Sequence, residues 1–397
     1  MIIQKYIMKK IPLLLLVVFL GTNQLRAQDS AQIILGSEHT IWSDVLNEER
    51  EYWISLPASY EDDMSAYKNY PVLIVLDGNT HFKALSSMVD YMSADRYRSR
   101  KIPGMIVVGI QNVDRRRDFT PDKVITVREN NTGGGDLFLN FLENELLPEL
   151  DKKYRTSPYR ILFGHSLGGL LATHAYLKDK TGFNAFIAAD PSFGTWDAET
   201  MDRKVDSMSE HSFDRFIYIA TANWGKRNIR NRDRHLRFYE LLNSKTDGVL
   251  PAKIEYFEDE SHSSVSLIAF HNGMNTIFEG YGISYRDIAT KEQLIQHFQG
   301  ISQRLSWDIL PPERLVNQIG YRLLRSSNED ERNRALEFFQ LNVEYYPESS
   351  NAFDSLGEAY EVYAETQKAI TAYQRSLDLN PDNVHASQKI RELSGRN

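Results

Sequence analysis

The sequence predicts an α/β fold, in which a doubly wound, mostly parallel sheet is followed by a small all-α region. Short, continuously apolar segments recur as far as about residue 285, and segments with helical spacing separate them. Parallel strands need such helical crossovers, and strands that are buried on both faces read as unbroken apolar runs. Beyond about residue 310 the strand pattern ends and only helical spacing remains.

The elements follow one another in the order that such a sheet requires. Residues 32–57 alternate polar and apolar side chains, which predicts an antiparallel hairpin or meander ahead of the parallel strands. The apolar runs and helical patterns that follow predict strands at 70–78, 104–110, 159–163, 184–189, 215–221 and 252–257, and helices at 135–153, 167–179, 196–208, 230–244 and 264–279.

Composition and charge restrict the class of protein. The chain has 397 residues, enough for a large and a small domain, and a formal net charge of −8. An acidic chain is a poor candidate for binding nucleic acid or an anionic membrane by charge, so we expect neither partner. The chain has no cysteine, which excludes disulfides, thiolate nucleophiles and cysteine-ligated metals.

The N-terminal residues 1–27 are typical of a secretory signal peptide. Lys9 and Lys10 precede an apolar run at 11–20, and a small residue, Ala27, ends the segment. The run is too short to span a bilayer comfortably, so we expect cleavage and no membrane span afterwards. The expected location is the bacterial periplasm or the exterior; the alternative is an uncleaved anchor.

The C-terminal region contains an internal repeat. At a shift of 34 residues, Pro347 matches Pro381 and Phe339 matches Tyr373. This period resembles that of tetratricopeptide repeats, with a first helix at 351–360 and a second at 364–379; a generic helical cap is the alternative.

We therefore expect the chain to have four parts, which are a signal peptide at 1–27, a large α/β domain at 28–290, a linker at 291–312 and helical repeats at 313–397. Two such units are few for a free-standing solenoid, so we expect them to pack against the large domain, a second copy or a protein partner.

A nucleophile is predicted where strand 159–163 meets helix 167–179. The pentad Gly164-His165-Ser166-Leu167-Gly168 lies at this junction. A sharp strand-to-helix turn crowds the residues two positions either side of its centre, and glycine removes that crowding. We therefore expect the Ser166 hydroxyl to stand at the carboxyl end of the strand, where a helix N-terminus favours developing negative charge.

A serine nucleophile needs a base, and the base needs an orienting acid. His262 follows the last predicted strand and precedes a helix, so we expect it to be the base. The acid is expected after strand 215–221, where Asp233 is the first carboxylate. Glu258 and Asp259 are the alternatives, as is a serine–histidine pair without an acid. A surface ion pair is an equally good reading of Asp233.

Other residues near the strand ends are candidates for stabilising and binding a substrate. The backbone N–H groups of Leu167 and Asn79 are expected to hold an oxyanion. Gly78 would let the backbone approach the substrate, and His165 would line the turn. Three further side chains, for which structural roles are equally compatible, are expected to shape the pocket: Arg117, Asp118 and Trp196.

These motifs in this order resemble the esterase-D-type "putative esterase" family of α/β-hydrolases. The resemblance covers about residues 35–285 and rests on Asp77-Gly78, Val108-Gly109-Ile110 with the segment 115–121, Gly164–Gly169, Asp190-Pro191-Ser192-Phe193 with Trp196, and Glu260-Ser261-His262. The resemblance implies an α/β-hydrolase fold. The family includes siderophore, feruloyl and acetyl-xylan esterases, S-formylglutathione hydrolases and mycolyltransferases. In many relatives the acid comes soon after strand 215–221, and its absence there is a departure.

The expectation is therefore an exported serine carboxylic-ester hydrolase that acts through an acyl-enzyme on Ser166, without metal or cofactor. Its substrate would be a small-molecule or glycan-linked ester of the siderophore or acyl-sugar type. The alternatives are an acyltransferase of the same fold and a catalytically inactive scaffold that carries the repeats.

Overall fold

The computed structural model describes residues 33–61, 68–94, 100–124, 131–196, 198–208, 214–225, 229–246 and 252–395. The expected signal peptide at 1–27 lies outside these ranges. Residues 35–397 form one compact unit. None of the helices within the described ranges combines the length and the apolar character that crossing a membrane requires.

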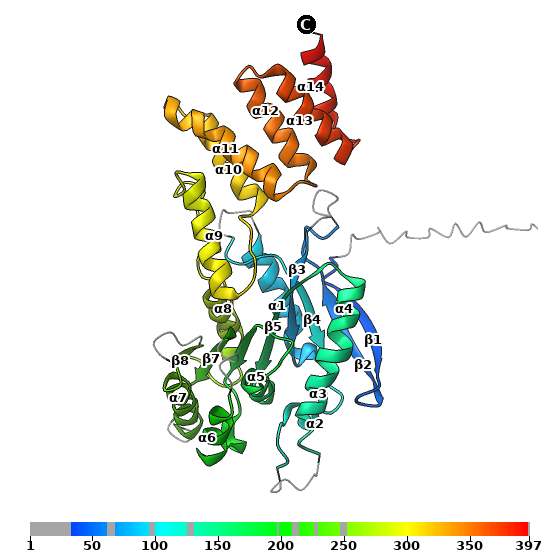
Figure 1. The fold of residues 1–397 in the computed structure, drawn as a ribbon. Coiled ribbons are helices and arrows are strands. Elements are labelled where there is room, and N and C mark those ends of the chain that lie inside the picture. The colour runs from blue at the N-terminus through cyan, green and yellow to red at the C-terminus, as the bar shows by residue number, and fades with distance from the viewer. Residues whose placement is uncertain are drawn as a thin grey trace, which may run out of the picture. The chain divides into compact units, whose positions relative to one another are not determined.

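One sheet organises the large domain (Figure 1). Its strands, within the described ranges, are β1 Ser37–Ser43, β2 Glu48–Ser55, β3 Tyr70–Val75, β4 Ile106–Ile110, β5 Thr156–His165, β6 Ala185–Ala189, β7 Phe216–Ala222 and β8 Ala252–Phe257. Their order across the sheet is β1-β2-β4-β3-β5-β6-β7-β8. β1, β2 and β4 pair antiparallel, and the other pairs are parallel. The predicted mostly parallel sheet is thus confirmed, and the carboxyl ends of β3 to β8 share one edge.

Helices cover both faces of this sheet. They are α1 Gly78–Ser93, α2 Arg115–Phe119, α3 Gly135–Phe141, α4 Leu147–Lys153, α5 Leu167–Leu177, α6 Ala198–Asp206, α7 Ile229–Asn243 and α8 Val265–Ile277, with a π-helical turn at Leu142–Leu146 and a 3-10 turn at Phe193–Thr195. Alternate side chains of β3 enter opposite cores. Leu73 and Val75 pack with α1 and α8, whereas Val72 and Ile74 pack with α3, α4 and α5. Helix α1 is the one crossover that the sequence analysis does not include.

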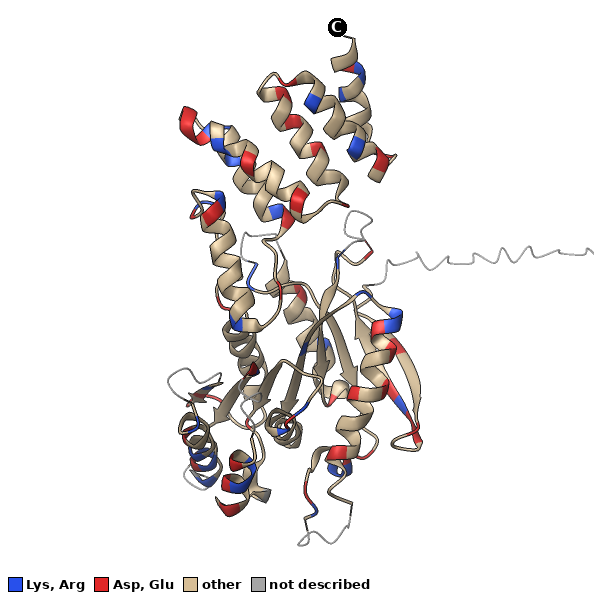
Figure 2. Cartoon of the chain, in the orientation of Figure 1, with Lys and Arg blue, Asp and Glu red and all other residues tan. Residues whose placement is uncertain are grey.

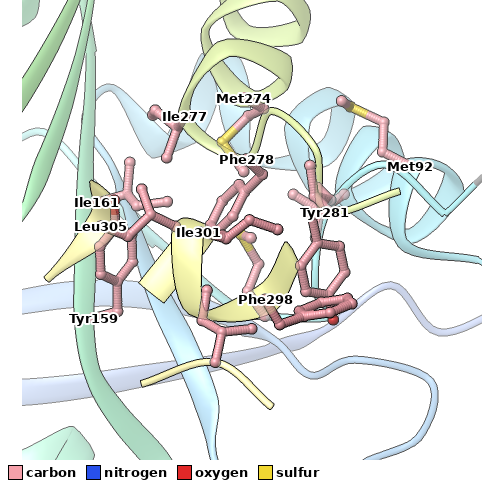
Figure 3. Close-up of a cluster of buried hydrophobic side chains, with 14 of the residues drawn as sticks. Met92, Tyr159, Ile161, Met274, Ile277, Phe278, Tyr281, Phe298, Ile301 and Leu305 are labelled. Atoms are coloured by element: carbon pink, nitrogen blue, oxygen red, sulfur yellow. The ribbon is translucent and has the colours of Figure 1, made fainter. Parts of the chain in front are cut away.

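The segment expected to be a linker, residues 291–312, begins with a helix. Helix α9 spans Lys291–Leu305, and Thr290 caps it by accepting a hydrogen bond from the backbone N–H of Gln293. Its buried residues repeat at helical spacing and join the core beside α8: Leu294, Phe298, Ile301 and Leu305. Figure 3 shows Phe298, Ile301 and Leu305 among side chains of β5 and α8. The expectation of a linker is therefore wrong for this segment, because its apolar stripe is buried against the large domain.

The remaining five helices within the described ranges are α10 Glu313–Leu324, α11 Glu329–Tyr345, α12 Ser350–Val362, α13 Thr366–Leu379 and α14 Val384–Ser394. Four of them form two pairs, α10 with α11 and α12 with α13, and α14 packs on α13. A Cβ added to Gly320 would lie 2.9 Å from the ring of Phe339, and one added to Gly357 would lie 2.6 Å from the ring of Tyr373. The two pairs therefore pack through the same small-against-large contact. The 34-residue shift aligns the two rings, whereas the two glycines lie 37 residues apart. The assignment to the tetratricopeptide class stays a prediction.

Candidate active site

Ser166 lies at the turn between β5 and α5, with φ 59° and ψ −115°. Such backbone angles are costly for a residue with a side chain and persist only where the surrounding structure enforces them. The turn needs glycine on its strand side, since a Cβ at Gly164 would lie 2.1 Å from the carbonyl oxygen of Gly168. The fold thus holds the Ser166 hydroxyl at the carboxyl edge of the sheet, as the pentad predicts.

His262 lies in the loop between β8 and α8, and its side chain reaches Ser166. The distance from His262 Nε2 to Ser166 Oγ is 3.0 Å. A quarter of the His262 side chain is exposed, so a proton-transfer site at Nε2 is accessible to a reacting molecule. The structure therefore brings together the two residues that the sequence analysis pairs as nucleophile and base.

The acid that contacts His262 is Asp190, and the expectation of Asp233 is wrong in its geometry. His262 Nδ1 lies 2.5 Å from Asp190 Oδ2. Asp233 is an exposed residue of α7, a helix rich in basic residues, which Figure 2 colours blue. Glu258 and Asp259 are exposed in the turn after β8. The physical reason is sheet order: β6 lies beside β5, so a residue that follows β6 is one strand away from Ser166.

The sequence contains a local signal for Asp190, which the expectation of an acid after strand 215–221 leaves unused. Asp190 directly follows the apolar run of β6, and its backbone is left-handed, with φ 44°. Aspartate tolerates this conformation better than most residues. A carboxylate at the carboxyl end of the strand next to the nucleophile strand is therefore a candidate acid on position alone.

Asp190 is fully buried, and hydrogen bonds compensate its charge. Oδ1 accepts a hydrogen bond from the backbone N–H of Ala222 at 3.1 Å, and Oδ2 accepts one from Trp224 Nε1 at 2.6 Å, beside the bond from His262. Burial by itself raises the pKa of a carboxyl group. Here the hydrogen bond from His262, with the other donors, outweighs burial, and the pKa of Asp190 lies below its ordinary value. Asp190 is thus ionised at neutral pH.

Two aromatic side chains confine the His262 ring. The ring centroids of His165 and Trp224 lie 4.5 Å and 4.4 Å from that of His262. His165 Nε2 also donates a hydrogen bond to the backbone oxygen of His262 at 2.7 Å. Burial, followed by the nearby His262, lowers the pKa of His165 to about 4. His165 is therefore a neutral residue that lines the turn and orients the His262 loop.

The backbone groups expected to form an oxyanion hole lie at two helix starts. Leu167 is the first residue of α5, and Asn79 is the second of α1. N–H groups in the first turn of a helix have no acceptor within that helix, and they favour negative charge. Gly78 has a packing reason in addition to the expected approach to the substrate, which stays a prediction. A Cβ there would lie 2.5 Å from the carbonyl carbon of Gly109, so close packing of α1 on β4 requires the glycine.

Arg115 connects these two helix starts. Its Nε donates to Asp77 Oδ1 at 2.6 Å and its NH2 group to Asp77 Oδ2 at 2.9 Å. The same NH2 group lies 3.3 Å from the backbone oxygen of His165. Since Asp77 precedes Gly78 and His165 precedes Ser166, this side chain links the α1 loop to the nucleophile turn.

Arg117 and Asp118 belong to an ion-pair network rather than to a pocket. Asp118 is 1% exposed and pairs with Arg50 NH1 at 2.8 Å and with Arg117 Nε at 2.7 Å. Arg117 also binds Glu48, and these carboxylates raise its pKa. Arg50 and Glu48 both come from β2, so the network joins α2 to the antiparallel end of the sheet. The expected pocket role is not supported for either residue.

Trp196 is a core residue and does not line the site. Its ring is fully buried and stacks on Phe193 with centroids 5.1 Å apart. Its Nε1 donates a hydrogen bond to Asp122 Oδ2 at 3.0 Å. The indole thus satisfies its polar group internally, as buried tryptophans usually do. The aromatic residue beside His262 is instead Trp224, which the sequence analysis does not single out.

Within the described ranges, Asp354, Glu358 and His385 form a group whose ligand atoms lie within 4.8 Å of one another. They come from α12 and α14, whereas Ser166 and His262 lie at the carboxyl edge of the sheet. His385 Nδ1 pairs with Asp354 Oδ2 at 2.9 Å. This group is accounted for as an ion pair between neighbouring helices.

Comparison with known proteins supports the class that this geometry indicates. Residues 43–232 match the family described as "Putative esterase". The chain is 27% identical over 239 residues to the ferri-bacillibactin esterase BesA of Bacillus subtilis (strain 168), covering 55% of this chain and 82% of that protein. It is 26% identical over 262 residues to the siderophore triacetylfusarinine C esterase of Aspergillus fumigatus, covering 57% and 88%. A solved structure of an IroE-like serine hydrolase from Shewanella oneidensis superposes with a TM-score of 0.67 and 27% identity, covering 77% of this chain and 99% of that one.

The parallel sheet with a serine at the turn after its central strand defines an α/β-hydrolase. The match over residues 43–232 specifies the group further: this part of the chain resembles the "putative esterase" family. The protein is a carboxylic ester hydrolase, followed by an all-helical C-terminal region.

Proposed function

We propose that this protein is a serine esterase that cleaves siderophore-type esters through an acyl-enzyme on Ser166. One observation carries the proposal: the unbroken hydrogen-bonded chain from Asp190 through His262 to Ser166, with distances of 2.5 Å and 3.0 Å. A nucleophile, a base and an orienting acid in this arrangement are the components of acyl transfer by serine enzymes.

The first half-reaction forms the acyl-enzyme. Ser166 Oγ attacks the ester carbonyl carbon while His262 Nε2 accepts the hydroxyl proton. The carbonyl oxygen becomes an oxyanion, and we assign its stabilisation to the N–H groups of Leu167 and Asn79. As the ester C–O bond breaks, His262 returns the proton to the departing alcohol oxygen. Asp190 remains ionised and stabilises the charged imidazole throughout.

The second half-reaction releases the acid. Water attacks the acyl carbon and gives a proton to His262 Nε2. The bond from the acyl carbon to Ser166 Oγ then breaks, its electron pair stays on Oγ, and His262 returns the proton to that oxygen. The products are a carboxylic acid and free enzyme. Every proton transfer in the cycle uses the same His262 nitrogen.

The substrate class comes from the relatives. Two proteins that resemble this chain over more than four fifths of their own length are named as a ferri-bacillibactin esterase and a siderophore triacetylfusarinine C esterase, one bacterial and one fungal. This supports a siderophore ester as the natural substrate. The pattern in residues 1–27 supports export, so we place the reaction in the periplasm or outside the cell.

The proposal is tested with ferri-bacillibactin, triacetylfusarinine C and a series of p-nitrophenyl esters, using mature wild-type protein and Ser166→Ala. Hydrolysis is followed by chromatography of the siderophore fragments and by release of p-nitrophenol. We expect serine-dependent cleavage of at least one siderophore, with kcat/KM reduced about 10³-fold or more in Ser166→Ala. Ser207→Ala is the matched control, because Ser207 is exposed and its hydroxyl donates to the backbone oxygen of Lys204 at the end of the same helix.

Other results would select other functions. Retained hydrolysis in Ser166→Ala would exclude the mechanism. Transfer of the acyl group to an added alcohol in preference to water would indicate an acyltransferase. Failure of a fluorophosphonate probe to label Ser166, together with no turnover, would indicate an inactive scaffold.

A further inference from the structure

A second serine lies against the nucleophile. Ser192 Oγ is 3.0 Å from Ser166 Oγ, the same distance that separates Ser166 Oγ from His262 Nε2. The backbone N–H of Ser192 also donates a hydrogen bond to the backbone oxygen of Ser166 at 3.0 Å. Ser192 is therefore tied to the nucleophile through both its main chain and its side chain, and no step of the mechanism above uses its hydroxyl.

The direction of the hydrogen bond follows from the protons available. Asp190 is ionised and can only accept, so the hydrogen on His262 is at Nδ1 and Nε2 carries a lone pair. Ser166 must then donate its single hydroxyl hydrogen to Nε2. Ser166 Oγ has no hydrogen left for Ser192, so Ser192 donates and Ser166 Oγ accepts. Ser192 is thus a hydrogen-bond donor aimed at the reacting oxygen.

The position of this donor is fixed by the residues beneath the loop. The backbone oxygen of Pro191 accepts hydrogen bonds from His235 Nε2 at 2.7 Å and from Asn231 Nδ2 at 3.3 Å. His235 is fully buried, and burial lowers its pKa, so the ring is neutral and its Nδ1 accepts from Thr221 Oγ1 at 2.9 Å. These contacts from β7 and α7 hold the centre of the Asp190–Ser192 loop.

The loop therefore places two side chains near the nucleophile, those of Asp190 and Ser192, on either side of the anchored residue Pro191. Asp190 precedes Pro191 and orients the base, whereas Ser192 follows it and touches the nucleophile. A donor held in place by packing and buried hydrogen bonds needs little reorganisation when charge develops on its acceptor, and preorganised donors of this kind contribute most to electrostatic catalysis.

We propose that Ser192 is a catalytic residue that stabilises Ser166 Oγ as the leaving group when the acyl-enzyme breaks down. This inference rests on the proposed function, because it needs an acyl group on Ser166. In the attack of Ser166, Oγ gives electron density to the acyl carbon, so a donor to Oγ does not favour that step. In deacylation the electron pair of the C–O bond returns to Oγ, and the Ser192 hydrogen bond strengthens as that charge grows.

The atoms of the step balance without a further reactant. Water has already added to the acyl carbon, and its proton is on His262 Nε2. The bond from carbon to Ser166 Oγ breaks with both electrons on Oγ, the oxyanion reforms a carbonyl, and the proton moves from Nε2 to Oγ. Ser192 keeps its own proton and donates a hydrogen bond throughout. The carboxylic acid leaves, and Ser166 is regenerated.

The experiment compares wild type, Ser192→Ala and Ser192→Cys by stopped-flow release of p-nitrophenol, followed by decay of the acyl-enzyme after excess substrate is removed. In Ser192→Ala we expect deacylation to slow about tenfold, the typical effect of losing one neutral hydrogen bond. The acylation constant kcat/KM should change less than about threefold. Ser192→Cys keeps a weak donor, so its deacylation rate should lie between those of wild type and Ser192→Ala. The deacylation rate of Ser207→Ala should match that of wild type.

The outcomes separate this inference from the function on which it rests. Equal loss in acylation and deacylation, or no loss in either, would overturn the role of Ser192 while serine-dependent turnover stands. A burst of p-nitrophenol that persists in Ser166→Ala would instead overturn the proposed function. Thermal unfolding of each variant shows whether a loss of activity reflects a loss of folded protein, and the Cys variant keeps the side-chain volume if the Ala variant is unstable.

Discussion

Asp118 and Asp190 are buried aspartates that follow strands at the carboxyl edge of the sheet, and their partners differ. Asp118 follows β4 and is 1% exposed, and Asp190 follows β6 and is fully buried. Asp118 pairs with two arginines, Arg50 and Arg117. Asp190 pairs with His262, whose other ring nitrogen reaches Ser166. Burial and ionic pairing are therefore shared, and only the second aspartate is connected to a group that can gain and lose a proton.

This difference shows that the partner side chain distinguishes a structural carboxylate from one that orients a catalytic base. An arginine stays protonated at any pH at which the protein is folded, so a pair with Arg50 is permanent and acts on stability. A histidine titrates near neutral pH, so a pair with Asp190 changes strength during a proton transfer. The partner, rather than the aspartate, decides between the two roles.

The sharpest test of this comparison is Asp190→Asn, for which we expect the largest effect. Asparagine keeps the shape but its amide group faces the Nδ1–H of His262, which favours the wrong tautomer. We expect kcat for p-nitrophenyl esters to fall by about 10³- to 10⁴-fold with a small change in KM. The matched control is Asp233→Asn, and steady-state kinetics should give kcat within about twofold of wild type. If Asp233→Asn were the damaging variant, the assignment of the acid would be reversed.

Asp118→Asn, in contrast, is expected to lower the stability of the fold and to leave kcat nearly unchanged. The substitution leaves Arg50, itself 1% exposed, with the carboxylate of Glu48, which also binds Arg117, in place of two carboxylates. Removing one partner of a buried ion pair typically costs about 3–5 kcal/mol. Urea unfolding at pH 7 measures this loss, and kcat of the folded variant should remain within about threefold of wild type. A fall in kcat without a fall in stability would place Asp118 in the site after all.

A smaller effect, on pH dependence, is expected of His165→Gln. The pKa of His165 is about 4 in the folded protein and about 6.5 when exposed, so the unfolded chain binds more protons between these values. The stabilising contribution is present above pH 6.5 and is lost as pH falls toward 4, by about 2–3 kcal/mol. Glutamine does not titrate.

Urea unfolding of both proteins at several pH values between 4 and 7.5 isolates this contribution. The wild-type free energy of unfolding should fall more steeply with decreasing pH than that of His165→Gln. Parallel curves for the two proteins would mean that the pKa of His165 is not lowered in the folded state.

Local patterns in the sequence were sufficient to predict most of the sheet and the nucleophile turn. Unbroken apolar runs marked strands such as β4 and β6, and the glycines around Ser166 have a steric reason that can be recognised without coordinates. Helix α1 was missed because it begins with a glycine, an asparagine and a threonine, residues typical of a turn. Its apolar spacing, from Phe82 to Met92, is nevertheless helical.

The acid of the site was not predictable by the same means. A carboxylate is placed by the order of strands across the sheet, and that order is a long-range property that no local pattern contains. Arg117, Asp118 and Trp196 were misplaced for a related reason. A residue type at a strand end indicates proximity to the site edge, but its neighbours, here β2 and Phe193, decide whether it faces the site or the interior.

The buried stripe of α9 has a consequence for how this protein can be divided. A single apolar cluster runs from β3 and β5 through α8 and α9 to residues of α10 to α13. A chain that ended at residue 290 would leave Phe278 and Tyr281 without Phe298, Ile301 and Leu305 against them. The C-terminal helices thus share one core with the large domain, and a boundary drawn before residue 291 would cut through that core.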